Sequence, residues 1–162
     1  MIKWLNYLEM FNNDKKKLTV CYFGTYTSEY SRNSTLISGL KKNEVDVVEC
    51  KTIRRGFLKY IDLIVKHWKI RNSYDIMIVG FQGIQAVILA KLLTRKTIIF
   101  DAFASIYDSM VMDRKSVKTG SFVARYYWWL DKISMILADI VLFETNENID
   151  YASKEFGIKK EK

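Results

Sequence analysis

The stretch FDAFASIYDSMVMDR, from Phe100 to Arg114, carries the densest set of reactive side chains in the chain. Directly after an apolar run it places the carboxylates Asp101, Asp108 and Asp113, together with Ser105, Tyr107 and Arg114. Such groups hydrogen-bond sugar hydroxyls, and one carboxylate could accept a proton as a general base. A purely structural interpretation stays open, in which Asp101 caps a neighbouring backbone and Asp113 pairs with Arg114.

A second polar stretch, GTYTSEYSR from Gly24 to Arg32, follows another apolar run. Its hydroxyls and backbone N–H groups, next to a helix start, could receive a phosphate. It has neither a dinucleotide fingerprint nor a Walker A lysine, so an ordinary strand-to-helix turn is an equal alternative. The Arg32 guanidinium is suited to bidentate binding of a phosphate or carboxylate. The alternative is that Arg32 forms a surface ion pair with Glu29.

Alternating strands and helices must position these stretches. Apolar and β-branched runs predict strands over 18–23, 45–49, 74–80, 97–101 and 139–143. Helices are predicted from an N-cap at Asn33-Ser34 and over 54–71, 82–93, 121–138 and 146–156, with a loop over 102–118. This order predicts a Rossmann-like or flavodoxin-like three-layer α/β/α domain with a parallel sheet of about five strands. Ligands of such sheets gather at the carboxyl ends of the strands, where both polar stretches lie.

Composition limits the class of protein. The 162 residues are 49% hydrophobic, enough for the core of one domain, and no apolar stretch reaches the ~18 residues of a membrane span. Without a secretory pattern at the start, we expect a cytoplasmic protein. Two cysteines and one histidine support neither a disulfide framework nor a metal site, so Cys21 and Cys50 are expected inside strands. His67 is expected at the surface, because it lies among basic residues of helix 54–71, away from the strand ends.

The net charge of +8 indicates an anionic partner. Helix 54–71 concentrates that charge in Arg54, Arg55, Lys59, Lys66 and Lys69, beside an apolar stripe of Phe57, Ile61, Ile64, Val65 and Trp68. This pattern predicts peripheral contact with the inner membrane face, which an amphipathic extension over residues 1–16 would reinforce. The alternative is that the stripe packs on the sheet.

The adjacent aromatic residues Tyr126 to Trp129 cannot all face one core. Their spacing does not suit RNA binding, and no nucleic-acid partner is expected.

The order of motifs resembles the amino-terminal domain of glycosyltransferase family 4 enzymes of GT-B architecture. The resemblance covers residues 17–158, before a basic tail at 159–162, and rests on FGT followed by Arg32-Asn33, YDIMIVGFQG, TIIFDAFASIYDSMVMDR and WWLDKISMILADIVLFET. It implies an acceptor-binding domain that faces a nucleotide-sugar donor held by a second domain or a separate subunit. The chain alone would then be inactive and bind no cofactor or metal, and its acceptor could be lipid-linked.

The resemblance also assigns residues. Gly24 and Thr25 would face the donor diphosphate, and Arg32 and Asn33 would begin the helix at the cleft. The acceptor side would hold Asp101, Ser105, Tyr107, Asp108, Asp113 and Arg114, with Asp108 or Asp101 contacting the attacking hydroxyl. The sequence departs from many relatives because it lacks paired glycines after the first strand and a histidine after the fourth.

Two other classes remain as alternatives. A flavodoxin-like electron carrier that binds flavin mononucleotide would share the length and element order, although flavodoxins tend to be acidic. A non-catalytic module that binds a membrane or a partner through helix 54–71 would explain the charge.

Overall fold

The computed structural model describes residues 17–27, 30–81 and 83–162. The proposed N-terminal extension, residues 1–16, lies outside this range. The strands are β1 (Thr19–Gly24), β2 (Asp46–Lys51), β3 (Ile76–Val79), β4 (Ile98–Phe103) and β5 (Ile140–Phe143). The helices are α2 (Ser31–Lys42), α3 (Leu58–Ile70), α4 (Ile84–Leu93), the π-helix η1 (Asp108–Asp113), α5 (Phe122–Leu137) and α6 (Asn146–Phe156).

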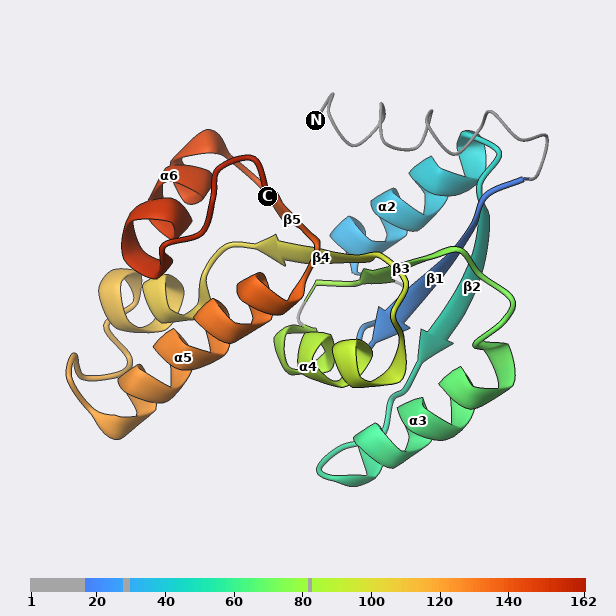
Figure 1. Cartoon of the computed structure of the whole chain (residues 1–162). Coiled ribbons are helices and arrows are strands. Elements are labelled where there is room, and N and C mark those ends of the chain that lie inside the picture. Colours follow the sequence, from blue (N-terminus) through green and yellow to red (C-terminus); the bar gives the residue numbers. More distant parts are fainter. Residues whose placement is uncertain (1–16, 28–29, 82) are drawn as a thin grey trace.

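The five strands form one parallel sheet in the order β2-β1-β3-β4-β5 (Figure 1). The chain moves outward from β1 to β2 and then returns past β1 to β3, so the order reverses between β1 and β3. This is the strand order of flavodoxin-like sheets. The predicted Rossmann-like α/β class is confirmed.

Helices cover both faces of the sheet. Leu63 of α3, Val87 of α4 and Met135 of α5 belong to one core cluster, together with Phe156 of α6. Ile37 and Leu40 of α2 belong to a second cluster on the opposite face. Figure 1 shows α3, α4 and α5 together on one side and α2 on the other. Both predicted strand cysteines, Cys21 and Cys50, are buried in β1 and β2.

Helix α2 begins two residues before the predicted N-cap, at Ser31 after Tyr30. Asn33 does not cap it, because its side chain is buried beside β1 instead. Its Oδ1 accepts a hydrogen bond from Tyr22 Oη at 2.9 Å, and its Nδ2 donates to the carbonyl of Thr27 at 3.3 Å. Asn33 therefore ties the first turn of α2 to the sheet.

The predicted loop over 102–118 contains helix η1. Ser105 caps the helical turn that leads into it, because its Oγ accepts from the backbone N–H of Asp108 at 2.9 Å. A serine followed by an acidic residue three positions later is a helix-start signature that this segment does contain.

Helix α3 packs on the sheet through a different face from the one its stripe indicated. Leu63 and His67 are buried, with Tyr60 and Ile70 half-buried on the same side. The stripe itself faces outward, with Phe57 74% and Trp68 67% exposed. The prediction of a surface His67 is therefore wrong. Its Nε2 lies 2.7 Å from Tyr74 Oη, and this hydrogen bond satisfies the polar group of the buried imidazole.

Residues 159–162, expected as a basic tail, return to the sheet. The backbone N–H of Val141 in β5 donates to the Lys162 carbonyl at 3.0 Å. Among the helices of the described ranges, none combines the length and apolarity that crossing a membrane requires.

Candidate functional site

An ion pair between α2 and β4 lies at the carboxyl edge of the sheet. Arg32 Nε is 2.8 Å from Asp101 Oδ2, and Nη2 is 2.5 Å from Oδ1. The Asp101 side chain is completely buried, whereas that of Arg32 is 23% exposed. The interpretation in which Arg32 pairs with Glu29 involves a residue outside the described ranges. Both residues were predicted for the site, and the structure brings them together.

The burial of Asp101 raises the pKa of its carboxyl, and the hydrogen bonds and charge of Arg32 oppose that rise. Both carboxylate oxygens accept from the guanidinium, which leaves this group facing Arg32 rather than an acceptor hydroxyl. The expectation that Asp101 contacts the attacking hydroxyl does not suit this placement. Asp101 instead fixes the position of a cation whose other side reaches the surface.

An aromatic cluster of three rings begins at this cation. The Arg32 guanidinium carbon lies 4.7 Å from the Phe103 ring centroid, Phe103 contacts Phe81 at 4.9 Å, and Phe81 contacts Tyr30 at 5.3 Å. Phe103 has a φ of +59°, in the left-handed region, where β4 shifts its register against β5. Strained residues and bulges of this kind gather near functional sites. No local sequence pattern indicates this cluster, because Tyr30, Phe81 and Phe103 come from two separate loops and the end of β4.

A buried carboxylate on α5 holds the segment after β4. Asp131 Oδ2 accepts from Ser105 Oγ at 2.7 Å and from the Tyr107 backbone N–H at 2.8 Å, and Oδ1 accepts from Ile106 N at 3.3 Å. Burial raises the pKa of Asp131, and these hydrogen bonds oppose the rise. Asp131 was not among the predicted site residues. Its one signal was an aspartate within the apolar run WWLDKISMIL of a predicted helix.

Asp108 is the predicted site carboxylate with the most suitable surroundings for proton transfer. It is half-buried in the first turn of η1, and burial, followed by the charge of Asp113, raises its pKa. A carboxyl whose pKa moves upward toward neutrality is a better general base. Tyr151 of α6 lies close enough for the Asp108 charge to raise the pKa of the phenol, after the larger effect of burial.

The remaining predicted residues divide between structural and exposed positions. Ser105 is buried, and its hydroxyl caps the helical turn that leads into η1 and donates to Asp131. Tyr107 is half-buried, while Asp113 and Arg114 are exposed at the end of η1. Gly24 and half-buried Thr25 lie at the same edge of the sheet, two strands from Asp101. Gly24 has a φ of +139°, a backbone conformation that side chains rarely permit.

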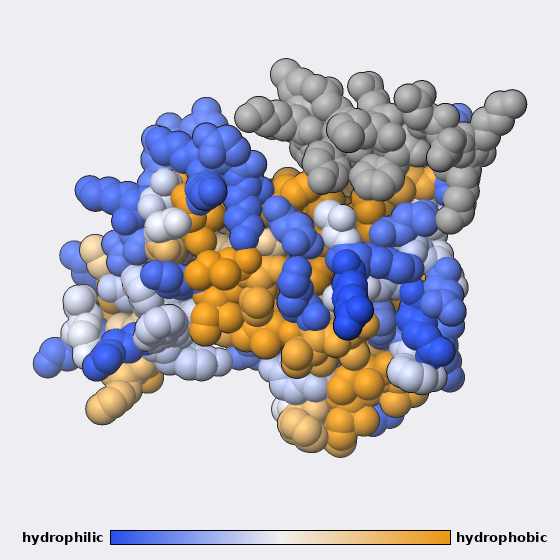
Figure 2. Space-filling model, viewed as in Figure 1, coloured by the Kyte–Doolittle hydropathy of each residue, from blue (hydrophilic) through white to orange (hydrophobic). Residues whose placement is uncertain are grey.

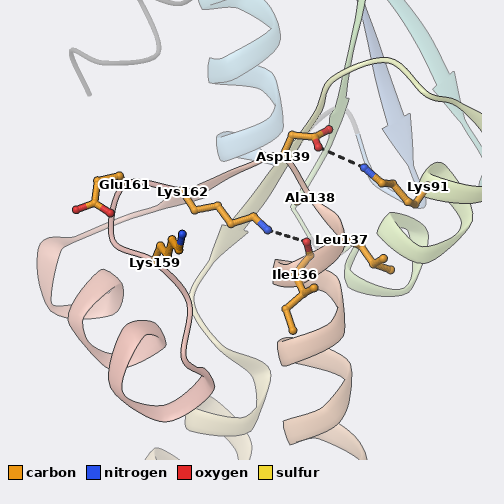
Figure 3. A pocket seen from close by; sticks show the side chains of 8 residues that line it. All are labelled: Lys91, Ile136, Leu137, Ala138, Asp139, Lys159, Glu161 and Lys162. Carbon is orange, nitrogen blue, oxygen red and sulfur yellow. Dashed lines mark hydrogen bonds and ion pairs between the residues drawn. The ribbon is translucent and has the colours of Figure 1, made fainter.

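Two of the hollows on the described surface border α5. The smaller, about 280 Å³, lies between the start of η1 and α5 and is lined by Tyr107, Gly120, Ala124, Arg125, Trp128 and Trp129. The larger, about 450 Å³, lies where α5 leads into β5, at the opposite edge of the sheet (Figure 3). There Lys162 Nζ donates to the Ile136 carbonyl at 2.6 Å, which places a cation at the helix C-terminus. Since this hollow is far from the carboxyl ends of the strands, it is not the candidate site.

In residues 17–27, 30–81 and 83–162, no cluster of three or more His, Cys, Asp or Glu side chains could hold a metal ion. Comparisons with protein-family models, with curated proteins and with solved structures found no match to this chain.

Proposed function

We propose that this chain is the acceptor-binding amino-terminal domain of a glycosyltransferase, which faces a donor-binding domain or a separate donor-binding subunit. The observation that carries the proposal is the pairing of Arg32 in α2 with Asp101 in β4 at the carboxyl edge of a parallel sheet, just before the segment that contains Asp108. Ligands bind at this edge in α/β sheets of this type. The resemblance to glycosyltransferase family 4 involves the same two segments.

In the proposed reaction, the acceptor lies against η1 and the Arg32 cluster. Asp108 accepts the proton of the acceptor hydroxyl while that oxygen attacks the anomeric carbon of the donor sugar. The bond from this carbon to the diphosphate breaks, and the nucleoside diphosphate leaves with the electron pair. Gly24 and Thr25 face the diphosphate from this side, and Arg32 offers a fixed cation to an anionic acceptor.

Asp101 and Asp131 are positioning residues in this scheme. Asp101 fixes the guanidinium of Arg32, and Asp131 holds the start of the helical segment on which Asp108 lies. Neither carboxylate needs to contact the substrate.

Complementation of a gene deletion tests the proposal. Three strains of the source cells are compared: one with the gene intact, one with it deleted, and one in which it carries Asp108→Asn. Membrane and soluble fractions of each strain are incubated with radiolabelled UDP- and GDP-sugars. Transfer of label should require the gene, and Asp108→Asn should lower it by about 100-fold or more, because general base catalysis contributes 10²–10⁴-fold. Asp46→Asn, at the opposite edge of the sheet, is the matched control and should keep full transfer.

Two results would overturn the proposal. The first is label incorporation that does not depend on the gene for any of these donors. The second is equal transfer by the wild-type chain and the Asp108→Asn variant when both are present at equal amounts.

The strand order favours a second candidate, a flavodoxin-like carrier of flavin mononucleotide. In that fold the flavin binds at the switch point, here between β1 and β3, and Gly24 to Thr27 would receive its phosphate. Titration with free flavin mononucleotide distinguishes the two functions. Stoichiometric quenching of flavin fluorescence would favour the carrier, whereas unchanged fluorescence would eliminate it.

A further inference from the structure

The exposed apolar side chains of this protein gather on one helical layer. In the part of the chain that the structure describes, all but two of the large exposed hydrophobic residues lie on α3, α4 and α5 or just before α3; the exceptions are Tyr30 and Met112. On α3 the exposed set comprises Phe57, at its N-cap, and Leu58, Ile61, Ile64, Val65 and Trp68. With 100° of rotation per residue, the centre of this exposed arc lies about 130° around the helix axis from the centre of the arc that packs on the sheet. The core therefore does not account for it.

The apolar surface continues from α3 to α5. Phe122 is 91% exposed at the first turn of α5, followed on the same helix by Tyr126, Trp129, Ile133 and Ile136. Gln85 of α4 connects the two helices, because its Oε1 accepts from Tyr60 Oη at 2.6 Å and its Nε2 donates to Tyr126 Oη at 3.1 Å. Figure 2 shows apolar atoms exposed over α3, at the lower right of the view. We name the exposed residues of α3, α4 and α5, with Ile53 and Phe57, the outer helical face.

Basic side chains border this face. Helices α3, α4 and α5 contain six lysines and arginines against two aspartates. Of these, Asp131 is buried and Asp62 binds Lys66 at 2.7 Å. Arg54 and Arg55 precede α3, and the Arg71 guanidinium lies 3.8 Å from the Trp68 ring centroid. By contrast, the sequence of α6 contains three acidic residues and one lysine. The charge that indicates an anionic partner is thus concentrated beside the apolar surface.

We propose that the outer helical face docks on an anionic lipid bilayer. Its aliphatic and phenylalanine side chains would enter the interfacial region, Trp68, Tyr126 and Trp129 would lie at headgroup depth, and the bordering lysines and arginines would contact lipid phosphates. A bilayer can bind a broad apolar and basic surface without the shape-matched pockets that a protein partner would need. The charge favours it over an apolar protein partner: in the described ranges Asp62 and Asp139 pair with Arg54, Lys66 and Lys91, and a bilayer offers anions to the other bordering cations. This inference does not depend on the proposed function.

Vesicle co-sedimentation of the full chain tests the docking surface. Vesicles of phosphatidylcholine with phosphatidylserine should bind the protein, and vesicles of phosphatidylcholine alone should bind it at least about tenfold more weakly, because each basic residue near an anionic surface contributes about 1 kcal/mol. The double substitution Arg55→Glu with Lys69→Glu should lower partitioning by about tenfold or more. The matched control, Lys41→Glu with Lys42→Glu, makes the same charge change on α2 of the opposite layer and should retain binding within about twofold.

A second variant tests the apolar contribution. Phe57→Ser with Trp68→Ser should also lower partitioning, and because both side chains are exposed, the unfolding midpoint in urea should stay unchanged. Brominated lipids should quench the tryptophan fluorescence of the wild-type chain, and Trp68→Phe should reduce that quenching.

Three outcomes would overturn the docking proposal. One is the absence of binding to anionic vesicles, and another is an equal loss in the α2 control, which would indicate a delocalised charge effect. The third is concentration-dependent self-association that Phe57→Ser with Trp68→Ser abolishes while vesicles bind nothing. In that case the face joins two copies of the chain.

Discussion

The Arg32–Asp101 pair shows how one buried contact can determine what a site residue does. The sequence placed both residues at the same sheet edge, but as separate groups available to ligands. The structure removes Asp101 from solvent and leaves its partner partly open. Breaking a buried ion pair from one side leaves an uncompensated charge, which is the source of its energetic importance.

Asp101→Asn should therefore destabilise the fold. We expect the free energy of unfolding in urea to fall by about 1.5 to 3 kcal/mol, the usual effect of losing a hydrogen bond to a charged group, because Arg32 loses its charged partner but stays partly open to solvent. Asp46→Asn breaks the exposed pair with Lys17 and should change that free energy by less than about 1 kcal/mol. Equal effects of the two substitutions would show that the Arg32–Asp101 pair is not buried in solution.

His67 is the single histidine of the chain, and it links stability to pH. Burial lowers its pKa, and the charges of Lys96 and Arg71 lower it further. The unfolded chain, with an ordinary pKa of about 6.5, then binds the proton more readily than the folded one. This contribution to stability is complete well above pH 6.5 and is lost as the pH falls below it.

Between pH 7.5 and 5.5, the wild-type chain should lose stability relative to His67→Gln, by at most about 1.4 kcal/mol per pH unit. Urea unfolding of both proteins at each pH measures the difference. The comparison is needed because the raised pKa values of Asp101 and Asp131 act in the opposite direction: those carboxyls bind protons more readily when folded. Parallel curves for the two proteins would contradict a buried neutral His67.

At the scale of elements, α3 shows the limit of periodicity. Its sequence has two apolar arcs, and the more continuous of them faces outward. The arc that packs contains Leu63 and His67, whose imidazole is matched by Tyr74 from the start of the next strand. Helical spacing identifies apolar arcs but not which of them faces the sheet, because that depends on partners distant in the chain.

The close packing between β1 and the residue that follows β3 depends on the absence of a side chain at Gly80. A Cβ at Gly80 would lie 2.5 Å from the Tyr22 ring, and that ring is fully buried with its hydroxyl bonded to Asn33 of α2. Gly80 thus admits the tyrosine that joins the sheet to its first helix.

Gly80→Ala should lower the free energy of unfolding by about 1 to 3 kcal/mol, the usual effect of overpacking a core. Gly39→Ala is its matched control, because Gly39 lies within α2 and a Cβ there would meet nothing within 4 Å. That variant should instead gain up to about 1 kcal/mol through helix propensity. Urea unfolding compares the two, and a shift of the same sign in both would contradict the close contact with Tyr22.

At the scale of the whole molecule, the sheet separates two surfaces. Its carboxyl edge gathers Arg32, the aromatic cluster and Asp108, while the layer of α3, α4 and α5 presents an apolar surface with basic borders. The proposed transfer site and the proposed docking surface therefore occupy different parts of one small fold.

The amino-acid sequence alone predicted the element order, the class of sheet, the buried strand cysteines and the sheet edge at which Arg32 and Asp101 lie. These properties follow from local patterns: apolar runs, turn residues and the right-handed connection of parallel strands. It also identified Arg32 and Asp108 as candidate site residues.

The role of each of those residues follows from its contacts in the folded chain. Asp131, Phe81 and Phe103 reach the site from separate elements, Asp101 becomes buried by its partner, and α3 turns its apolar stripe to the outside. Burial and pairing depend on contacts between residues that are far apart in the chain, and local spacing carries no information about those contacts.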